Sequence, residues 1–191
     1  MTSFPPLTPK DLKKLANRKF SDLVLAEIHR SRARIGALQT TYPSADRNEL
    51  ATRLIDTKKT IATTGGAVSG LFGLVSVPLY LVFVTYLQVS LLVDIAVLTG
   101  VNLKSARAQD ELLDLLGYAN GTGPLVRAGP KVLGRIAVAL LQRGGLPGLG
   151  RAVPVVASPL TAYLNNRALK RVGQEALRYY AREGKRQKAD D

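Results

Sequence analysis

The stretch Val77–Thr99 reads VPLYLVFVTYLQVSLLVDIAVLT, and it decides the fold class of the chain. It contains one charged residue, Asp94, and one proline, Pro78, near its start, and Gly100 follows its end. At about 1.5 Å per residue, a helix of this length is about 33 Å long, close to the thickness of the hydrocarbon core of a bilayer. The stretch therefore predicts a long apolar helix, either at the centre of a soluble bundle or inserted in a membrane.

The residues before this helix are uncharged as well, because no Asp, Glu, Lys or Arg occurs from Thr60 to Val93. Within this segment Gly66, Gly70 and Gly73 recur at helical spacing. Small residues allow helices to approach closely, in membranes and in soluble bundles alike. We therefore expect these three glycines and Pro78 to serve either helix packing or apolar insertion into a membrane.

Helical patterns occupy the rest of the chain. Caps and apolar repeats predict helices from Thr8–Pro9 to Tyr42, from Asp46 to Gly65–Gly66, from Ser105 to Tyr118, from Pro130 to Gly144, and from Ser158–Pro159 to Glu183. In the second of these, Lys58 and Lys59 are expected in the last turns, where positive charge suits the helix dipole. We expect an all-α fold, a single bundle of about six helices with a long apolar central helix, organised as a basic N-terminal helix (1–43), a main helical domain (44–183) and a disordered tail (184–191).

The charge of the chain is strongly positive and unevenly distributed. There are 27 Lys and Arg against 14 Asp and Glu, which gives +13. Residues 1–60 carry +6, residues 61–103 carry −1 and residues 104–191 carry +8. An apolar middle between basic flanks supplies the two signals of membrane binding, insertion and attraction to anionic lipid. Nucleic-acid binding needs no such uncharged middle, so we do not expect nucleic acid as a partner.

The last predicted helix has an apolar face and a basic face. Its apolar face contains Leu160, Leu164, Ala168, Val172, Ala176 and Tyr180, and its basic face contains Arg167, Lys170, Arg171, Arg178 and Arg182. Each Lys or Arg near an anionic membrane contributes about 1 kcal/mol. We expect the five basic residues to bind anionic lipid headgroups. The alternatives are contact with an acidic or membrane protein and a solvated face that keeps the protein soluble.

Two polar residues of the apolar helix, Gln88 and Asp94, are expected to be buried. A carboxylate among apolar residues is costly unless it is paired, is protonated or faces a cavity. A pore or proton site is one interpretation of Asp94. The favoured interpretation is structural, with Asp94 paired to an Arg or Lys of another helix or reaching the membrane interface near the helix end. Gln88 is expected to form a hydrogen bond between helices.

No constellation of residues predicts catalysis. The chain has no Cys, and His29, its single histidine, lies in a basic helix. Gly145–Ala152 has two glycines at phosphate-loop spacing, but Arg151 and Ala152 stand where that motif needs Lys and Ser or Thr. We predict a non-enzymatic protein without a metal or cofactor. The first residues lack the pattern of a signal peptide, which favours the cytoplasm.

A series of motifs extends over about two thirds of the chain. It consists of the glycine-rich entry Gly65–Gly70, Pro78 opening the apolar helix with Gln88 in its middle, the exit Gly100–Leu103, and Pro154–Val156, Asn165, Arg167, Val172–Gly173 and Ala176. In their order and spacing these motifs resemble the EcsC family of bacterial proteins. The chain departs from the family pattern at Thr99 and at Ser158–Pro159. The resemblance implies a helical protein without established enzymatic activity, associated with membranes and linked with transport systems. It adds no catalytic residue.

These observations together predict a protein that docks on the inner face of the cell membrane. The basic helix would hold anionic lipids, and the stretch Gly65–Thr99 would supply apolar insertion. The alternative is a soluble, all-helical interaction module in which this apolar stretch is buried core.

Overall fold

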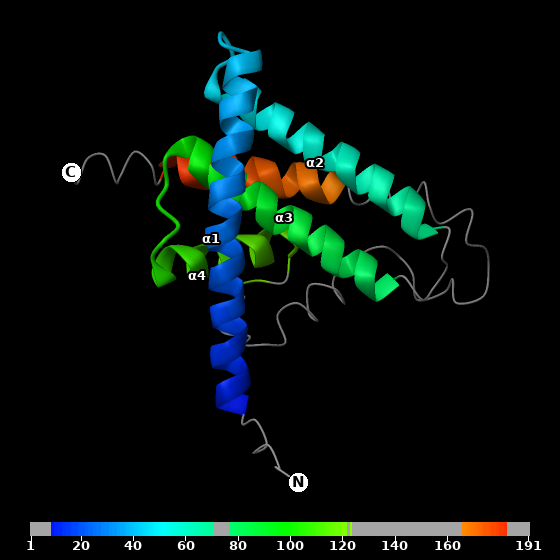
Figure 1. Ribbon diagram of the computed structural model, residues 1–191, viewed down its shortest axis with the longest axis vertical. Helices are drawn as coiled ribbons and strands as arrows, with labels where there is room; N and C mark the ends of the chain where they lie inside the picture. Colours follow the sequence, from blue (N-terminus) through cyan, green and yellow to red (C-terminus); the bar gives the residue numbers. More distant parts are fainter. Residues whose placement is uncertain (1–8, 71–76, 122, 124–165, 183–191) are drawn as a thin grey trace.

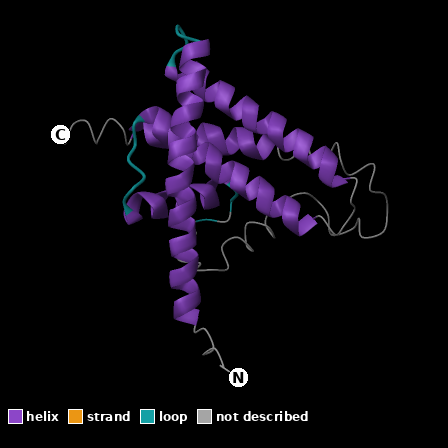
Figure 2. Ribbon diagram, viewed as in Figure 1, coloured by secondary structure: helices purple, strands orange, loops and turns teal. Residues whose placement is uncertain are grey.

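The computed structural model describes residues 9–70, 77–121, 123 and 166–182. Every regular element in these ranges is an α-helix, as Figure 2 shows, and this confirms the predicted all-α class. The helices are α1 (Pro9–Thr41), α2 (Arg47–Gly70), α3 (Val77–Thr99), α4 (Ala106–Ala119) and a C-terminal helix at residues 166–182. The helix predicted from Pro130 to Gly144 lies outside the described residues.

Short sequence signals set the ends of the helices. Helix α1 begins at Pro9 and ends at Thr41, before the predicted break. The Asp46 carboxylate accepts a hydrogen bond from the backbone N–H of Glu49 (2.7 Å), which caps α2. The Ser105 hydroxyl accepts one from the N–H of Ala108 (3.2 Å), which caps α4. Local capping chemistry therefore explains both starts.

The predicted end of the second helix was wrong. Helix α2 continues through Gly65 and Gly66 to Gly70, so Lys58 and Lys59 lie in its middle and its last turn contains no basic residue. A glycine inside a helix costs only about 1 kcal/mol relative to alanine. This cost alone does not end a helix whose preceding residues, such as Ala62, are held in the core. The physical role of Lys58 is therefore unrelated to the helix dipole.

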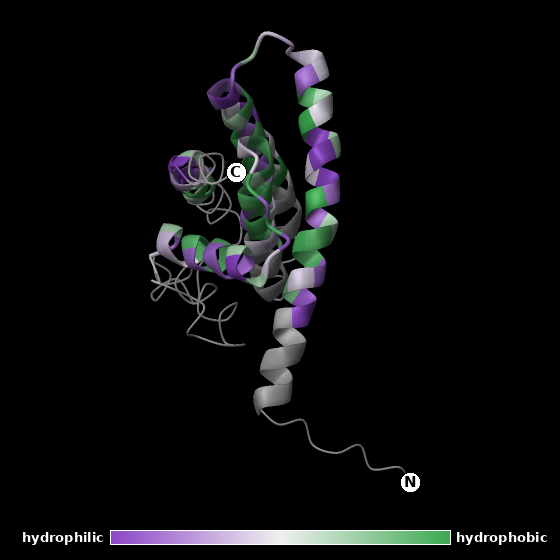
Figure 3. Cartoon of the chain, turned by 90° about the vertical axis from the view of Figure 1, so that its left-hand side faces the viewer, coloured by the Kyte–Doolittle hydropathy of each residue, from purple (hydrophilic) through white to green (hydrophobic). Residues whose placement is uncertain are grey.

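Helix α3 packs against α1, α2 and α4 (Figure 1). Every residue from Leu87 to Ala96 is buried, and a helix that is buried all around its circumference belongs to a protein core or a membrane. Figure 3 shows the apolar residues concentrated on the helices that lie between α1 and the C-terminal helix. Among the residues described, no helix combines the length and the apolar character that crossing a membrane requires.

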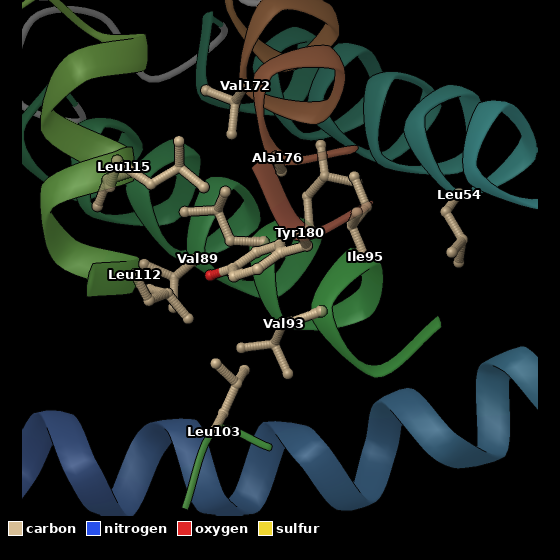
Figure 4. Close-up of a cluster of buried hydrophobic side chains, with 14 of the residues drawn as sticks. Leu54, Val89, Val93, Ile95, Leu103, Leu112, Leu115, Val172, Ala176 and Tyr180 are labelled. Atoms are coloured by element: carbon tan, nitrogen blue, oxygen red, sulfur yellow. The ribbon is translucent and has the colours of Figure 1, made fainter. Parts of the chain in front are cut away.

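The C-terminal helix runs antiparallel to α2. A Cβ atom placed on Gly173 would lie 2.5 Å from Ile55 Cγ1 of α2 and 3.3 Å from Leu91 Cδ2 of α3. Nearer the start of the C-terminal helix, the Thr63 hydroxyl donates to Asn166 Oδ1 (3.3 Å). The start of the C-terminal helix therefore lies toward the Gly70 end of α2. Figure 4 shows Val172, Ala176 and Tyr180 of this helix pointing into a cluster with residues of α3 and α4.

Helix α3 ends in a glycine cap. Gly100 has a φ of +83°, in the left-handed region where a side chain is strained. The N–H of Gly100 donates to Val97 O (3.1 Å) and the N–H of Val101 donates to Ala96 O (2.9 Å), the bond pattern of a Schellman motif. Val101 is itself buried, which fixes the direction in which the chain leaves α3.

Candidate functional site

The C-terminal helix presents the two faces that the sequence predicted. Its buried side contains Val172, Ala176 and Tyr180, as predicted, together with Leu169, which was not predicted. The predicted Ala168 is only partly buried. All five residues of the basic face are exposed, namely Arg167, Lys170, Arg171, Arg178 and Arg182. At 3.6 residues per turn, these five fall within about 120° of arc along a strip about 22 Å long. The helix can therefore offer its charges to a partner without leaving the core. Leu160 and Leu164 lie outside the described residues.

Within the described part of the chain, most of this basic face lacks a neutralising carboxylate. Arg178 lies 3.5 Å from Glu175, one turn before it on the same helix. Among the described residues, no carboxylate pairs with the other four cations of the face. Guanidinium and ammonium groups in this state attract phosphate-bearing surfaces, and salt screens that attraction. The face is therefore suited to an anionic partner.

A second group of charges lies inside the protein, where α1, α2 and α3 meet. Glu27 and Asp94 are completely buried, Lys58 is 4% exposed and Arg34 is partly buried. The two acids and two bases balance in charge, which is the condition under which ions are tolerated in a core. We call these four residues the buried charge cluster.

Asp94 is the acceptor that joins the three helices. Its Oδ1 atom accepts from Arg34 Nη2 (2.5 Å) and Arg34 Nε (3.1 Å), both from α1. Its Oδ2 atom lies 3.2 Å from Lys58 Nζ of α2, an ion pair without hydrogen-bond alignment. The structure thus pairs Asp94 with basic residues of two other helices, as the favoured interpretation of the sequence required.

Glu27 completes the cluster through side chains of α1 and α3. It accepts hydrogen bonds from the Ser90 hydroxyl (2.5 Å), the Tyr86 hydroxyl (3.0 Å) and Arg34 Nη2 (2.6 Å). Burial on its own would raise the pKa of Glu27, but the hydrogen bonds from Ser90, Arg34, Tyr86 and Arg30 outweigh burial and lower that pKa to about 2. Glu27 is therefore ionised at neutral pH.

For Lys58, burial has a larger effect on the pKa than the favourable contacts have. Burial lowers its pKa, and the attraction of Asp94 only partly offsets that effect. Its Nζ atom donates to Ser90 Oγ at 2.5 Å, which resembles the contact of a serine–lysine catalytic pair. The Ser90 hydroxyl, however, is buried and donates to Glu27. Within the described residues, the contact of Ser90 with Lys58 is therefore part of the buried network that links α1, α2 and α3.

Gln88 lies inside the protein, as expected from the sequence. Its Oε1 atom accepts a hydrogen bond from Nδ2 of Asn120 at the end of α4 (2.6 Å), which links α3 to α4. Its Nε2 atom has no hydrogen-bond acceptor among the described residues.

The single histidine, His29, is exposed on α1. Across the described residues, no three metal-binding side chains come together.

The structure locates most of the predicted packing residues without showing their surroundings. Gly66 and Gly70 lie in the last turns of α2, and Pro78 is the second residue of α3, where a helix tolerates proline. Gly73 lies outside the described residues. Their role in packing or insertion therefore stays a prediction.

Sequence reasoning missed three of the four members of the buried charge cluster, although a signal was present. Lys58 lies on the apolar face of α2, one turn from Leu54 and one turn from Ala62. The pattern of this face predicts an apolar residue at its position. Glu27 interrupts the stripe of α1 beside Val24 and Ile28 in the same way. A charged residue at a core position of a helix indicates a buried partner of opposite charge.

Comparison of the chain with models of protein families, with curated proteins and with solved structures finds no match. The likeness to the EcsC family therefore rests on the quoted sequence motifs.

Proposed function

We propose that the protein is a non-enzymatic, membrane-associated helical protein that docks on an anionic membrane surface through its C-terminal helix. The observation that carries the proposal is the exposed basic face opposite a buried apolar face on one helix. The resemblance to the EcsC family adds two points to this proposal. The anionic surface is the inner face of the cell membrane, and the protein serves a transport system there. The complete domain in this proposal has about six helices around α3.

The free energy of membrane binding needs a second contribution besides the attraction between charges. Five basic residues at about 1 kcal/mol each give about 5 kcal/mol, which corresponds to binding near the millimolar range. Stable attachment to membranes usually combines such a basic patch with an apolar anchor. The uncharged, glycine-rich stretch that follows Thr64 in the sequence is a suitable anchor.

The way in which α2 and the C-terminal helix lie beside each other supports a combination of basic patch and apolar anchor. Residues Leu87–Ala96 are occupied by core contacts, so the proposed insertion rests on the preceding part of the stretch, Gly65–Val82. The contact of Thr63 with Asn166 brings the start of the C-terminal helix toward the Gly70 end of α2. Arg167, Lys170 and Arg171 are then the members of the basic face nearest to the proposed anchor.

Cosedimentation with vesicles tests this proposal. The purified chain is mixed with phosphatidylglycerol vesicles or with phosphatidylcholine vesicles, at low and at high salt. We expect binding to the anionic vesicles only, and weaker binding at high salt. A variant with four glutamines on the basic face should lose most of that binding, and the substituted residues are Arg167, Lys170, Arg171 and Arg182.

A matched control removes the same number of charges elsewhere. It replaces four exposed basic residues of α1, α2 and α4 with glutamine, namely Arg18, Lys19, Arg47 and Arg107. This control should keep most of its vesicle binding if the C-terminal face is the docking surface. Equal losses in both variants would mean that net charge alone acts, and no loss in the first variant would exclude the face as a docking surface. An alkaline carbonate wash of cell membranes then tests the anchor, because an inserted segment resists it.

The second candidate function is a soluble interaction module. It is favoured by the burial of Leu87–Ala96, which gives the apolar sequence of α3 a role in the core. In this case the basic face meets an acidic protein. The same vesicle experiment separates the two functions, because the module remains in the supernatant with either lipid.

A further inference from the structure

A pocket of about 240 Å³ lies between α1 and the connection from α3 to α4. Figure 1 shows this connection beside α1, and the glycine cap at Gly100 directs the chain into it. The Asn102 side chain accepts a hydrogen bond from the Lys104 N–H (3.0 Å), which fixes the turn locally. The pocket shares no lining residue with the basic face or with the buried charge cluster. It is therefore a separate feature of the fold.

The pocket has an apolar floor and a cationic rim. Ile28, Val101 and Leu103 are 8%, 7% and 1% exposed, so they form a floor that belongs to the core. Arg32 of α1 and Lys104 of the connection line the same pocket and are exposed. No carboxylate lines the pocket, and among the described residues no acid pairs with either cation. Within the described residues, two positive charges thus line one small cavity without a neutralising acid.

We propose that this pocket binds a phosphate ester with a small apolar substituent, its phosphate held between Arg32 and Lys104 and its substituent placed over Val101 and Leu103. The guanidinium group of Arg32 offers a planar pair of donors that fits phosphate oxygens, and Lys104 adds a point charge. A phosphate monoester carries nearly two negative charges at neutral pH and therefore matches two cations better than a single carboxylate does. The small volume restricts the ligand to a headgroup or a small metabolite.

The experiment follows backbone amide signals by NMR while butyl phosphate is added to the full chain. The signals of Gly100, Val101 and Leu103 should shift in a saturable manner, and inorganic phosphate should bind more weakly because it leaves the apolar floor uncovered. Arg32→Gln and Lys104→Gln should each weaken binding by about tenfold, the loss of one charge-assisted contact. Arg107→Gln, which removes a nearby exposed charge outside the pocket, should leave the affinity within about twofold.

The absence of saturable shifts at these residues up to about 10 mM butyl phosphate would overturn the proposal. Equal weakening by Arg107→Gln would overturn it as well, because it would indicate a diffuse attraction to the basic surface.

Two sources of the phosphate ester are then distinguished with vesicles that contain phosphatidic acid. If Arg32→Gln/Lys104→Gln lowers binding to these vesicles, the pocket takes a lipid phosphate. If vesicle binding is unchanged while butyl phosphate binding is lost, the pocket takes a soluble phosphate ester. Either result upholds the site, and neither depends on the C-terminal basic face, whose own variant retains Arg32 and Lys104.

Discussion

Lys58 and Arg178 lie on helices that pack together, yet the side chain of Lys58 is 6% exposed and that of Arg178 is 72% exposed. Lys58 forms an ion pair with Asp94 and a hydrogen bond with Ser90, both on another helix, whereas the one ion pair of Arg178 within the described part of the chain is with Glu175, one turn away. A solvated charge contributes little to folding and remains available to a partner. A buried charge is committed to its partners, and removing one of them leaves an uncompensated ion. We therefore expect the buried charges to specify the fold, and we propose that the exposed charges serve recognition.

The largest effect is expected from Asp94→Asn. The substitution keeps the size of the side chain but leaves Arg34 and Lys58 without their shared carboxylate. Breaking a buried ion pair on one side costs about 3–5 kcal/mol, so urea unfolding should show a loss of that order. Asp110→Asn, at an exposed position of α4, should change stability by less than about 0.5 kcal/mol.

A double substitution sharpens this test. Lys58→Met/Asp94→Leu removes one positive and one negative charge and leaves the Glu27–Arg34 pair in place. Apolar residues of similar volume often replace a buried ion pair without loss, so the double variant should recover at least half of the stability that Asp94→Asn loses. A double variant as unstable as the single one would show that shape, and not charge balance, decides stability here.

The next effect is a dependence of stability on acid pH. The pKa of Glu27 is lowered to about 2 in the folded chain, from an ordinary value of 4.5. The stabilisation is complete above pH 4.5 and is lost as the pH falls toward 2, by roughly 3 kcal/mol in total. Urea midpoints measured from pH 6 to pH 2 should show this fall. Glu27→Gln should flatten it, and an equally steep fall in that variant would assign acid sensitivity to other groups.

A smaller effect concerns what holds the basic helix in place. Gly173→Ala would put a methyl group 2.5 Å from Ile55 Cγ1, and a stiff, β-branched neighbour in a packed core moves at a cost of about 1–3 kcal/mol. Gly36→Ala on α1 meets nothing within 4 Å, so it should be neutral or stabilising by up to about 1 kcal/mol. Thermal unfolding of the two variants compares these outcomes. If Gly173→Ala is as stable as Gly36→Ala, close packing does not anchor the C-terminal helix.

Periodicity and caps predicted the all-α class, the cap at Asp46, the start of α4 near Ser105, and the two faces of the C-terminal helix, because these features depend on neighbours within a turn or two. The end of α2 was not predictable in this way, since glycine weakens a helix without forbidding it. Asp94 was recognised as anomalous, but its partners Arg34 and Lys58 lie 60 and 36 positions away along the chain. Such pairing depends on how three helices pack, which local patterns do not contain.

The smallest change in stability is expected at Arg178, the exposed residue that was compared with the buried Lys58. Arg178→Gln removes a pair with Glu175 whose two side chains are 72% and 45% exposed. Such surface pairs contribute about 0–1 kcal/mol, and glutamine retains good helix propensity, so the unfolding free energy should change by less than about 0.5 kcal/mol. Urea unfolding at pH 7 measures this change, and vesicle binding measured on the same protein should weaken by up to about 1 kcal/mol. A large loss of stability with unchanged vesicle binding would contradict the roles given to the two sets of charges. Arg178 would then hold the C-terminal helix in place, and other residues would bind the vesicles.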